Sequence, residues 1–411
     1  MRRNLQYPST KTLSANAILA KGAFAVGCRT EDGKIVPALS AFKGAGWCPV
    51  NVKMTAYSAG AKKFFVWADG VAYSSSTGTG FGELYQIDSK FPFVFDKRDE
   101  SGVCAYFAGN DFYITHDGKS ISTRIFDMPV YGGVFRYGRL FGIDNADAYK
   151  LRWSGKGGAF DWEENIDGAG WVNLVTDGGE ILDLVNFKDK LCAVRENGLA
   201  VISAFGTPEN FTVKYADGRT PAAVKSTAAV AGDKLIFCTE SGLYFYDGGA
   251  VEKVECGLFE DLQNFKFAKA LGNEYFLCCE SKTLNRGAVL VYNAATGGAY
   301  LADCAADALV AHGKIYAYTP SGAYTLKEGG TFSFTSGSLF FSAQRKVLKY
   351  VEVEADGEVE IEVSNGVKSR IFGGQFTKIY PKMSGKYFKI TVRGKGEVRS
   401  LSAYAEVVNA V

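Results

Sequence analysis

The sequence predicts an all-β protein. Of its 411 residues, 48 are glycine and 14% are aromatic, whereas only nine are proline. Aromatic residues favour strands, and glycine favours the tight turns that join them. The apolar share of 47% is that of a globular chain rather than a disordered one. We therefore expect short strands joined by glycine turns along most of the chain.

Charge and hydropathy exclude several classes of protein. The 46 basic and 44 acidic residues nearly cancel, which gives no reason to expect a nucleic-acid binder. No apolar run approaches the roughly 20 residues that a membrane helix needs, and the first residues make a poor signal peptide, so we expect no membrane partner. The nine cysteines are odd in number and lie mostly in strand-like runs, which favours reduced, buried thiols over disulfides.

Four ten-residue segments resemble one another. Each begins with a polar or small residue followed by lysine, continues through apolar and aromatic residues, and closes on glycine. The segments are AKKFFVWADG (61–70), DKLCAVRENG (189–198), DKLIFCTESG (233–242) and GKIYAYTPSG (313–322). A second strand follows each glycine, so each segment is the first half of a predicted β-hairpin.

Three further hairpins complete a regular series. They are a shorter copy, NDFYITHDG (110–118), and two degenerate ones: residues 139–153, turning near Asn145 to Asp147, and residues 274–293, turning near Gly287. The seven turns recur about every 42 residues, the length of four short strands with their connections. This spacing predicts a β-propeller of about seven blades, within a range of six to eight, over residues 21–335 after an N-terminal arm at 1–20.

Two points about this propeller stay open. A pair of stacked sandwiches fits the composition but not the regular spacing. A predicted hairpin at Gly22–Phe42, turning at Asp32 and Gly33, either completes another blade or forms an eighth unit.

After about Thr335 the pattern changes to strict alternation around Asp356-Gly357. One face is apolar and the other is acidic, which predicts a long hairpin with one wet face. The apolar positions are Val351, Val353, Val359, Ile361 and Val363, and the acidic positions are Glu352, Glu354, Glu358, Glu360 and Glu362. Further strands of period two follow, so we expect residues 336–411 to form a separate C-terminal β-sandwich domain.

The glutamates form a candidate subunit interface. Like charges two residues apart on a strand face repel one another unless basic side chains lie opposite. Such side chains follow at Lys389, Arg393 and Arg399. The two stripes either meet within the sandwich, where they are structural, or face outward and form a self-complementary contact between subunits.

Residues suited to catalysis are scarce. The two histidines, His116 and His312, are nearly two hundred residues apart and are expected in turns. The sequence contains no metal-binding His/Cys spacing, no G-x-S-x-G elbow, no P-loop and no dinucleotide fingerprint. We therefore expect no catalytic residue, no cofactor and no metal, and hence no enzyme.

The segment 136–202 carries a more particular pattern. In the pattern of interest, a strand reading Arg-Leu-Phe leads to a turn, then to Arg-x-x-Trp-Ser or a close variant of it. A glycine, an aromatic residue near a tryptophan, and a Gly-Gly-x-Ile that opens the next blade follow. The matching residues are Arg139, Leu140, Phe141, Arg152, Trp153, Ser154, Gly158, Phe160, Trp162, Gly178, Gly179 and Ile181. Over about 65 residues this segment resembles the β-propeller tail proteins of bacteriophages, of the podovirus-type tail nozzle or tail-accessory family.

The resemblance implies a non-enzymatic structural protein of the virion tail, assembled in the cytoplasm of the host bacterium. Its implied partners are copies of itself in a ring and neighbouring tail or portal proteins, and DNA would pass passively through the ring. The motif residues are expected to be structural. The alternative function is a carbohydrate-binding propeller for receptor or glycan recognition, in which exposed Tyr and Trp on glycine turns stack on sugar rings.

Overall fold

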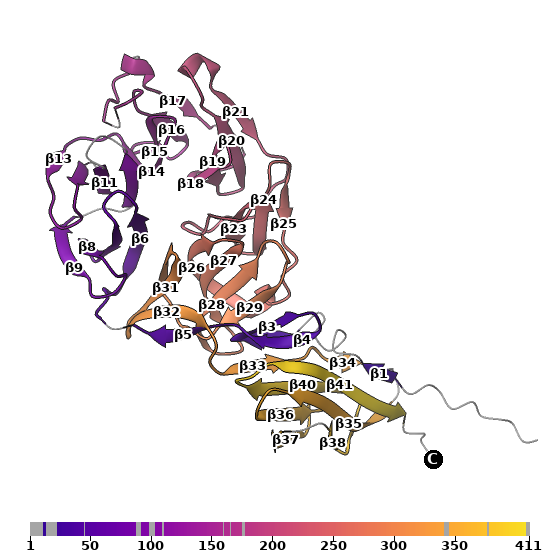
Figure 1. Cartoon of the computed structure of the whole chain (residues 1–411). Helices are drawn as coiled ribbons and strands as arrows, with labels where there is room; N and C mark the ends of the chain where they lie inside the picture. Colours follow the sequence, from indigo (N-terminus) through magenta and orange to yellow (C-terminus); the bar gives the residue numbers. More distant parts are fainter. Residues whose placement is uncertain are drawn as a thin grey trace, which may run out of the picture. The chain divides into compact units, whose positions relative to one another are not determined.

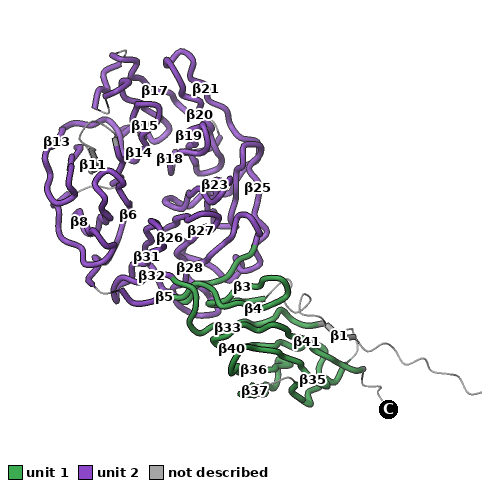
Figure 2. The backbone as a smooth tube through the Cα atoms, in the orientation of Figure 1, with its two compact units in different colours: residues 1–40, 298–303, 327–411 green, residues 41–297, 304–326 purple. Residues whose placement is uncertain are grey.

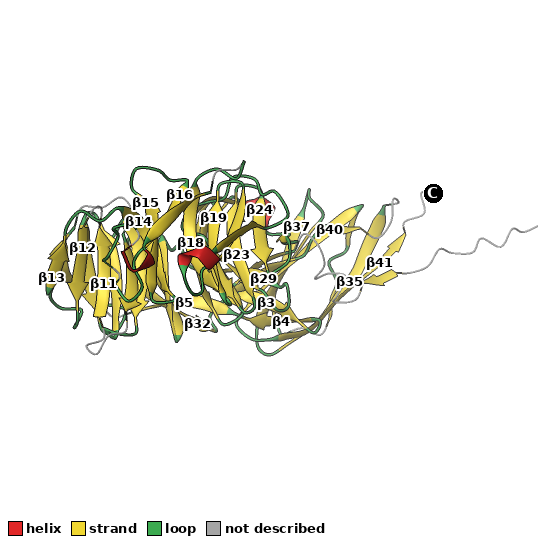
Figure 3. Ribbon diagram, turned by 90° about the horizontal axis from the view of Figure 1, so that it is seen from above, coloured by secondary structure: helices red, strands yellow, loops and turns green. Residues whose placement is uncertain are grey.

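The computed structural model describes residues 11–13, 23–44, 46–87, 92–97, 103–108, 111–158, 160–164, 166–174, 177–340, 345–375 and 378–407. Their regular structure is almost entirely strand (Figure 3), so the predicted all-β class is confirmed. The contacts divide the chain into two compact units (Figure 2). The larger unit is Ala41–Gly297 with Cys304–Leu326, and the smaller is Met1–Ser40 with Gly298–Asp303 and Lys327–Val411.

The larger unit consists of antiparallel sheets built in chain order. Five of them contain four consecutive strands each. These are β6 (Val52–Ser58), β7 (Lys63–Ala68), β8 (Val71–Ser75) and β9 (Gly82–Gln86); β10 (Phe93–Lys97), β11 (Val103–Ala108), β12 (Asp111–Thr115) and β13 (Thr123–Ile125); β14 (Val130–Arg136), β15 (Arg139–Asp144), β16 (Lys150–Trp153) and β17 (Gly170–Asn173); β18 (Ile181–Phe187), β19 (Lys190–Arg195), β20 (Gly198–Ser203) and β21 (Thr212–Tyr215); and β22 (Ala229–Ala231), β23 (Lys234–Thr239), β24 (Gly242–Tyr246) and β25 (Val251–Lys253).

Two more sheets follow, and short 3-10 turns lie between strands. The strands are β26 (Leu262–Leu271), β27 (Glu274–Ser281) and β28 (Arg286–Asn293), then β30 (Ala308–His312), β31 (Lys314–Thr319) and β32 (Gly322–Glu328) with β5 (Leu39–Lys43) as fourth strand. The 3-10 turns are η1 (Ile166–Gly168), η2 (Pro208–Asn210) and η3 (Phe259–Asp261). The backbone amide of Gly44, just after β5, donates to the carbonyl of Ala323 at 2.7 Å.

The first strands of the sheets form a closed cycle. β6 contacts β10, and the contacts continue through β14, β18, β22 and β26 to β30, which contacts β6 again (Figure 1). A series of sheets that returns to its start has rotational order, unlike two stacked layers. The larger unit is therefore a β-propeller, as the regular turn spacing predicts.

Most of the predicted hairpins join the second and third strands of a sheet. The β7–β8 turn, for example, places Asp69 at φ +48° and Gly70 at φ +77°, the left-handed region that a tight hairpin needs. The copy at 110–118 is an exception, because Gly118 lies between β12 and β13, the third and fourth strands. The turn between the second and third strands of this sheet is the one between β11 and β12. The predicted series therefore counted the next turn of the sheet in place of this one.

A second difference concerns Gly287. It lies inside β28 rather than in the turn, which falls between Ser281 and Arg286. An added Cβ on Gly287 would lie 3.2 Å from the Cβ of Ala305, so the glycine serves close packing rather than turn geometry.

Burial in the propeller is concentrated on the middle strands. Fully buried aromatic side chains recur from sheet to sheet: Phe65, Phe112, Phe141, Phe237 and Phe276. Side-chain hydrogen bonds join adjacent sheets. The hydroxyl of Thr55 on β6 donates to the carbonyl of Leu309 on β30, where the cycle closes, and the hydroxyl of Tyr275 donates to the carbonyl of Thr227 at 2.7 Å.

The smaller unit contains two sheets. One runs β3-β4-β41-β35-β38, with β1 and β39 attached, and the other runs β29-β2-β33-β40-β36-β37, with β34 attached. The strands are β1 (Lys11–Leu13), β2 (Phe24–Val26), β3 (Cys28–Glu31), β4 (Lys34–Pro37), β29 (Ala299–Ala302), β33 (Phe332–Thr335), β34 (Leu339–Phe340), β35 (Lys346–Ala355), β36 (Val359–Ser364), β37 (Ser369–Gly374), β38 (Lys378–Ile379), β39 (Met383–Gly385), β40 (Tyr387–Gly394) and β41 (Val398–Val407). Alternate residues of β35, β36 and β40 are buried, so each sheet has one apolar face. Two sheets with one apolar face each are compatible with a β-sandwich, which stays a prediction for this unit.

The division into units differs from the expected boundaries at residues 20 and 335. The predicted hairpin at Gly22–Phe42 is split: β3 and β4 pair around Asp32 and Gly33 in the smaller unit, and β5 completes a propeller sheet. The expected arm at 1–20 lies largely outside the described residues; its described strand β1 pairs with β41.

The predicted long hairpin around Asp356-Gly357 is wrong. β35 pairs with β38, β39 and β41, whereas β36 pairs with β37 and β40 in the other sheet. Alternation predicts a strand and its buried face correctly, but it does not specify the partner strand, because a chain reversal can join strands of different sheets.

Of the nine cysteines, the eight whose side chains the structure describes are free thiols, and all of these but the half-buried Cys256 are buried. Burial raises the pKa of Cys28 and Cys192 to about 12. Among the described residues, no helix is long and apolar enough to cross a membrane.

The hydrogen bond at the closure of the cycle has a measurable effect. Thr55→Val keeps the shape of the side chain and removes the hydroxyl, leaving the carbonyl of Leu309 without its donor. We expect the free energy of unfolding to fall by about 1–2 kcal/mol, measured by chemical denaturation. Thr212→Val on β21 is the control, because Thr212 is exposed and should tolerate the change. Equal stability of the two variants would contradict a role in closure.

Candidate functional site

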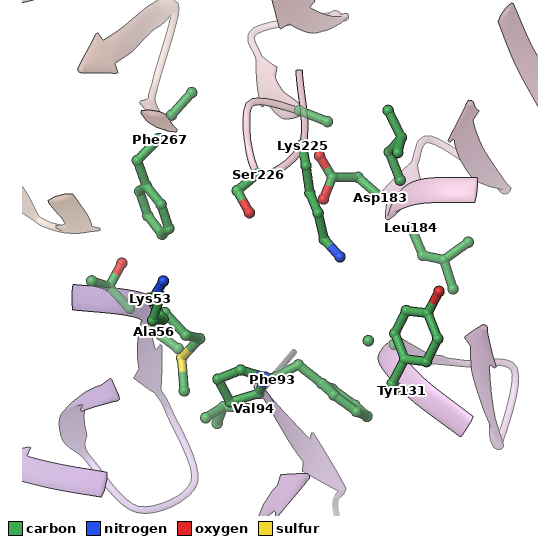
Figure 4. Close-up of a pocket in the computed structure, with 18 of the residues that line it drawn as sticks. Lys53, Ala56, Phe93, Val94, Tyr131, Asp183, Leu184, Lys225, Ser226 and Phe267 are labelled. Atoms are coloured by element: carbon green, nitrogen blue, oxygen red, sulfur yellow. The ribbon is translucent and has the colours of Figure 1, made fainter. Parts of the chain in front are cut away.

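The first strands of the propeller sheets line a cavity of about 470 Å³ (Figure 4). β6, β10, β14, β18 and β26 contribute to it, together with the segment before β22. Its charged residues are Lys53, Asp183, Lys225 and Lys269, and its aromatic residues are Phe93, Tyr131 and Phe267. Three cations and one carboxylate therefore meet in one partly enclosed space.

Asp183 is the only acidic residue of this lining. It lies on β18 beside an irregularity of the β18–β19 pairing. Burial raises the pKa of Asp183 to about 6, which outweighs the lowering by the backbone of Ala228 and by Lys225. Its Oδ2 is buried and has no hydrogen-bond partner among the described residues. The carboxylate is thus held in the cavity with one acceptor atom unused.

Two of the lysines are partly buried with it. Burial lowers the pKa of Lys225 and of Lys269 to about 8, and the Asp183 carboxylate opposes the lowering in both cases. The ammonium group of Lys225 lies 5.5 Å from the ring centroid of Tyr131, and that of Lys269 lies 5.1 Å from the ring centroid of Phe267. Lys53 is exposed at the edge of the cavity.

Sequence reasoning missed this cluster, because its members lie far apart in the chain. The available signal was a charged residue inside an apolar run, as at Asp183 in ILDLVNF and Lys269 in FAKAL. In both strands the charge occupies a position that faces the centre of the ring, which only the closed cycle of strands reveals.

The predicted motif residues form a second, structural cluster. Arg139 is buried, and its guanidinium donates to the carbonyls of Ser154, Asp167 and Gly168 at 2.8, 2.9 and 3.0 Å. The Ser154 hydroxyl in turn accepts a hydrogen bond from the backbone amide of Leu140 at 3.0 Å. This arginine therefore ties the long β16–β17 connection to β15.

The aromatic motif residues join neighbouring sheets. The indole of Trp153 donates to the carbonyl of Gly168 at 3.0 Å and packs edge-on against Phe211, which belongs to the next sheet. Phe160 packs edge-on against Phe112 of the preceding sheet, and Trp162 joins the same core cluster. The motif thus connects three successive sheets.

The remaining motif residues have steric or charge roles. An added Cβ on Gly178 would lie 2.5 Å from a guanidinium nitrogen of the buried Arg195, whose Nε donates to the carbonyl of Gly179 at 3.0 Å. A Cβ on Gly158 would overlap the carboxylate of Asp161. Arg152 pairs with Asp144. Arg195 was not predicted, although Gly178 leaves the space that its guanidinium occupies.

The acidic stripe of the smaller unit is partly paired within the chain. Arg393 on β40 pairs with Glu360 and Glu362 on β36, at 2.6 and 3.0 Å. Arg399 lies 2.5 Å from Asp356 and 3.8 Å from Glu354. For these residues, the contacts agree with the alternative in which the acidic and basic stripes meet within one chain.

Three members of the candidate interface remain: Glu352, Glu358 and Lys389 have no ion pair within the described part of the chain. Nothing in the structure assigns them to a subunit contact.

The two histidines lie in different settings. The ring of His312 stacks on that of Tyr57 with centroids 3.4 Å apart, and His116 is exposed after β12. Among the described residues, no group of three His, Cys, Asp or Glu side chains is placed to hold a metal ion.

No protein-family model matches the chain, and no curated protein matches its sequence. A solved streptogramin B lyase structure is 10% identical, with a TM-score of 0.50, and the match covers 71% of this chain and 97% of that one. At this identity the likeness shows the fold alone.

Two further solved structures give lower TM-scores. PorZ, from the type-IX secretion system of Porphyromonas gingivalis, is 11% identical with a TM-score of 0.44, and the match covers 82% of this chain and 46% of PorZ, so it spans less than half of that protein. The Neurospora crassa Pan2 WD40 domain is 8% identical with a TM-score of 0.42, and the match covers 67% of this chain and 88% of that one.

The buried motif arginine predicts a large stability effect. Arg139→Met keeps an unbranched chain in place of the aliphatic part of arginine and leaves three carbonyls without their donor. We expect the free energy of unfolding to fall by about 3 kcal/mol, followed by tryptophan fluorescence in denaturant. Arg219→Met is the control, because Arg219 forms only an exposed ion pair with Asp177. A loss no larger than in the control would mean that Arg139 does not hold the connection.

The buried lysine predicts a pH effect on stability. Between a folded-state pKa of about 8 and the ordinary value of 10.5, the unfolded chain binds a proton at Lys269 that the folded chain has released. Raising the pH through this window therefore stabilises the wild type relative to Lys269→Met. Unfolding free energies of both proteins at pH 7.5 and pH 10 measure this difference. Asp183 titrates below this window.

Lys266→Met is the control on the same strand. Lys266 lies 2.7 Å from Asp307, and this contact raises its pKa, so it keeps its proton across the window. The wild type should gain nothing over Lys266→Met between the two pH values. A parallel pH dependence for wild type and Lys269→Met would contradict the burial of the Lys269 ammonium.

Proposed function

We propose that this protein is a non-enzymatic structural component of a phage tail, a nozzle or tail-accessory protein that assembles with copies of itself into a ring. The observation that carries the proposal is the use of the motif residues. Among the residues that carry the resemblance to tail propellers, Trp153, Phe160 and Trp162 join three successive sheets. Arg139 holds the long β16–β17 connection against β15. The resemblance is thus one of a rigid scaffold rather than of a reactive site.

The size of the central cavity defines how DNA would pass. A volume of about 470 Å³ lies in the range of small-molecule sites. Such a cavity does not admit a nucleic-acid duplex. In this proposal the passage for DNA is formed by a ring of several copies, with the propeller as a spacer in its wall.

An edge strand of the smaller unit supports assembly. β37 is the last strand of its sheet in the described residues, so one side of its backbone is open to pairing. The side chain of Ile371 on β37 is 60% exposed, and that of the nearby Val367 is 87% exposed. Exposed apolar residues beside an open edge are typical of a surface that another chain covers.

A carbohydrate-binding role is the second candidate. Trp47, Phe126 and Phe205 are more than half exposed in connections between propeller strands. Aromatic faces of this kind stack on sugar rings. Binding of the purified chain to a glycan array would favour this function over a purely structural one.

The assembly proposal predicts the effect of a charge on the edge strand. The full chain should form ring-shaped oligomers in electron micrographs, alone or together with tail and portal proteins. Ile371→Lys should raise the concentration at which oligomers form by tenfold or more, measured by analytical ultracentrifugation. Phe126→Lys is the control, since Phe126 is 61% exposed but lies on the propeller.

A monomeric wild type at high concentration that also fails to bind tail and portal proteins would overturn the proposed function. Equal weakening by both substitutions would instead place the interface outside β37.

A further inference from the structure

We propose that the central cavity of the propeller binds a small hydroxylated organic anion, such as a sugar acid or a sugar phosphate. The inference rests on the convergence of Lys53, Lys225 and Lys269 on one cavity together with Asp183, whose buried Oδ2 has no partner among the described residues. It does not depend on the proposed role in a tail.

The cavity has the size and the rigidity of a ligand site. Its volume of about 470 Å³ falls within the roughly 300–1,000 Å³ of typical small-molecule pockets. Its walls are strands held by sheet pairing and by the closed cycle of contacts. A preformed cavity of this kind loses little conformational entropy when it binds a ligand.

The charge of the cavity selects an anion. Three lysines and one aspartate are the only charged residues of the lining, which leaves an excess of two positive charges. Figure 4 shows the Lys225 ammonium extending into the open space that Asp183, Tyr131 and Phe267 border. Because water is partly excluded, attraction between an ammonium group and an anion is stronger here than on the surface.

Asp183 favours a ligand that carries a hydrogen-bond donor. A buried acceptor without a partner costs free energy. A small rotation of the carboxylate would turn this atom, which is closed to water in the structure, toward a donor on the ligand. Acetate has no such donor and inorganic phosphate has only a P–OH beside its charge, whereas a sugar acid or a sugar phosphate carries several hydroxyl groups away from its charged group. The pKa of Asp183, about 6, leaves it mainly ionised and able to accept at neutral pH.

The aromatic walls fit the carbon face of such a ligand. Phe93 and Phe267 border the space that the Lys225 ammonium enters (Figure 4). Apolar C–H groups of a sugar ring pack favourably on aromatic faces. The cavity therefore offers separate partners for the charge, the hydroxyl groups and the ring of one small molecule.

Calorimetric titration of the full chain tests the inference. The probes are D-glucuronate and D-glucose 6-phosphate, with neutral D-glucose and the simple anions acetate and inorganic phosphate for comparison. At least one sugar anion should bind tenfold or more tightly than glucose and than the simple anion with the same charged group. The stronger of the two sugar anions identifies carboxylate or phosphate as the preferred group.

Variants locate the binding. Lys225→Met and Lys269→Met should each weaken the sugar anion by tenfold or more, and Asp183→Leu should abolish its advantage over the simple anion. Lys266→Met, on the same strand but paired with Asp307, should bind as the wild type does. Thermal unfolding without ligand shows whether each variant is folded.

A measurement on the wild type alone covers variants that do not fold. At pH 8 Lys225 and Lys269 are partly deprotonated and should take up protons when the anion binds. Titrations in buffers of different ionisation enthalpy measure this proton uptake. The other titratable groups of the lining are Lys53, Asp183 and Tyr131. No binding of either sugar anion at millimolar concentration, equal binding of glucose, or binding without proton uptake would overturn the inference. The state of assembly is measured separately, so either proposal can fail without the other.

Discussion

The structure depends on one constraint: each propeller sheet has two apolar faces and can bury them only against its neighbours. A sheet of three or four short strands does not bury enough surface to be stable alone. The contacts from β6 through β30 and back to β6 satisfy this requirement for every sheet at once, because a closed cycle has no terminal member. β5 supplies the last strand of the sheet that contains β30, β31 and β32, so segments far apart in sequence share one hydrogen-bonded sheet.

Closure also explains why polar groups are buried in so apolar a core. Long connections such as the one between β16 and β17 cross the sheets and carry backbone carbonyls away from water. Arg139 and Arg195 satisfy these carbonyls with charged donors, and Gly178 leaves room for the second guanidinium. The cost of burying an arginine is offset when several hydrogen bonds hold it. The most distinctive residues of the sequence therefore hold the long connections between strands.

The central cavity is a consequence of the same geometry. First strands arranged around an axis cannot all touch at the centre, so their inward side chains border a common space. Apolar side chains would simply fill it, whereas Lys225, Lys269 and Asp183 keep charges there at the expense of shifted pKa values. Charges that burial disfavours are kept where a ligand or a partner charge compensates for them. The propeller thus combines a stiff scaffold with a chemically defined centre.

The sequence by itself determined the local structure: the strands, most hairpin turns, the buried faces and the all-β class, because these follow from residue spacing and turn chemistry over fewer than ten residues. It also marked Arg139 and the Gly-Gly pair through a motif. Only the tertiary structure decided which strands share a sheet. It placed Gly118 in a third–fourth strand turn, put β35 and β36 in different sheets, and brought Glu360 and Glu362 to Arg393. The central lysines and Asp183 also escaped prediction, because residues on separate strands meet only when the cycle closes, and pairing between distant strands leaves no local pattern to read.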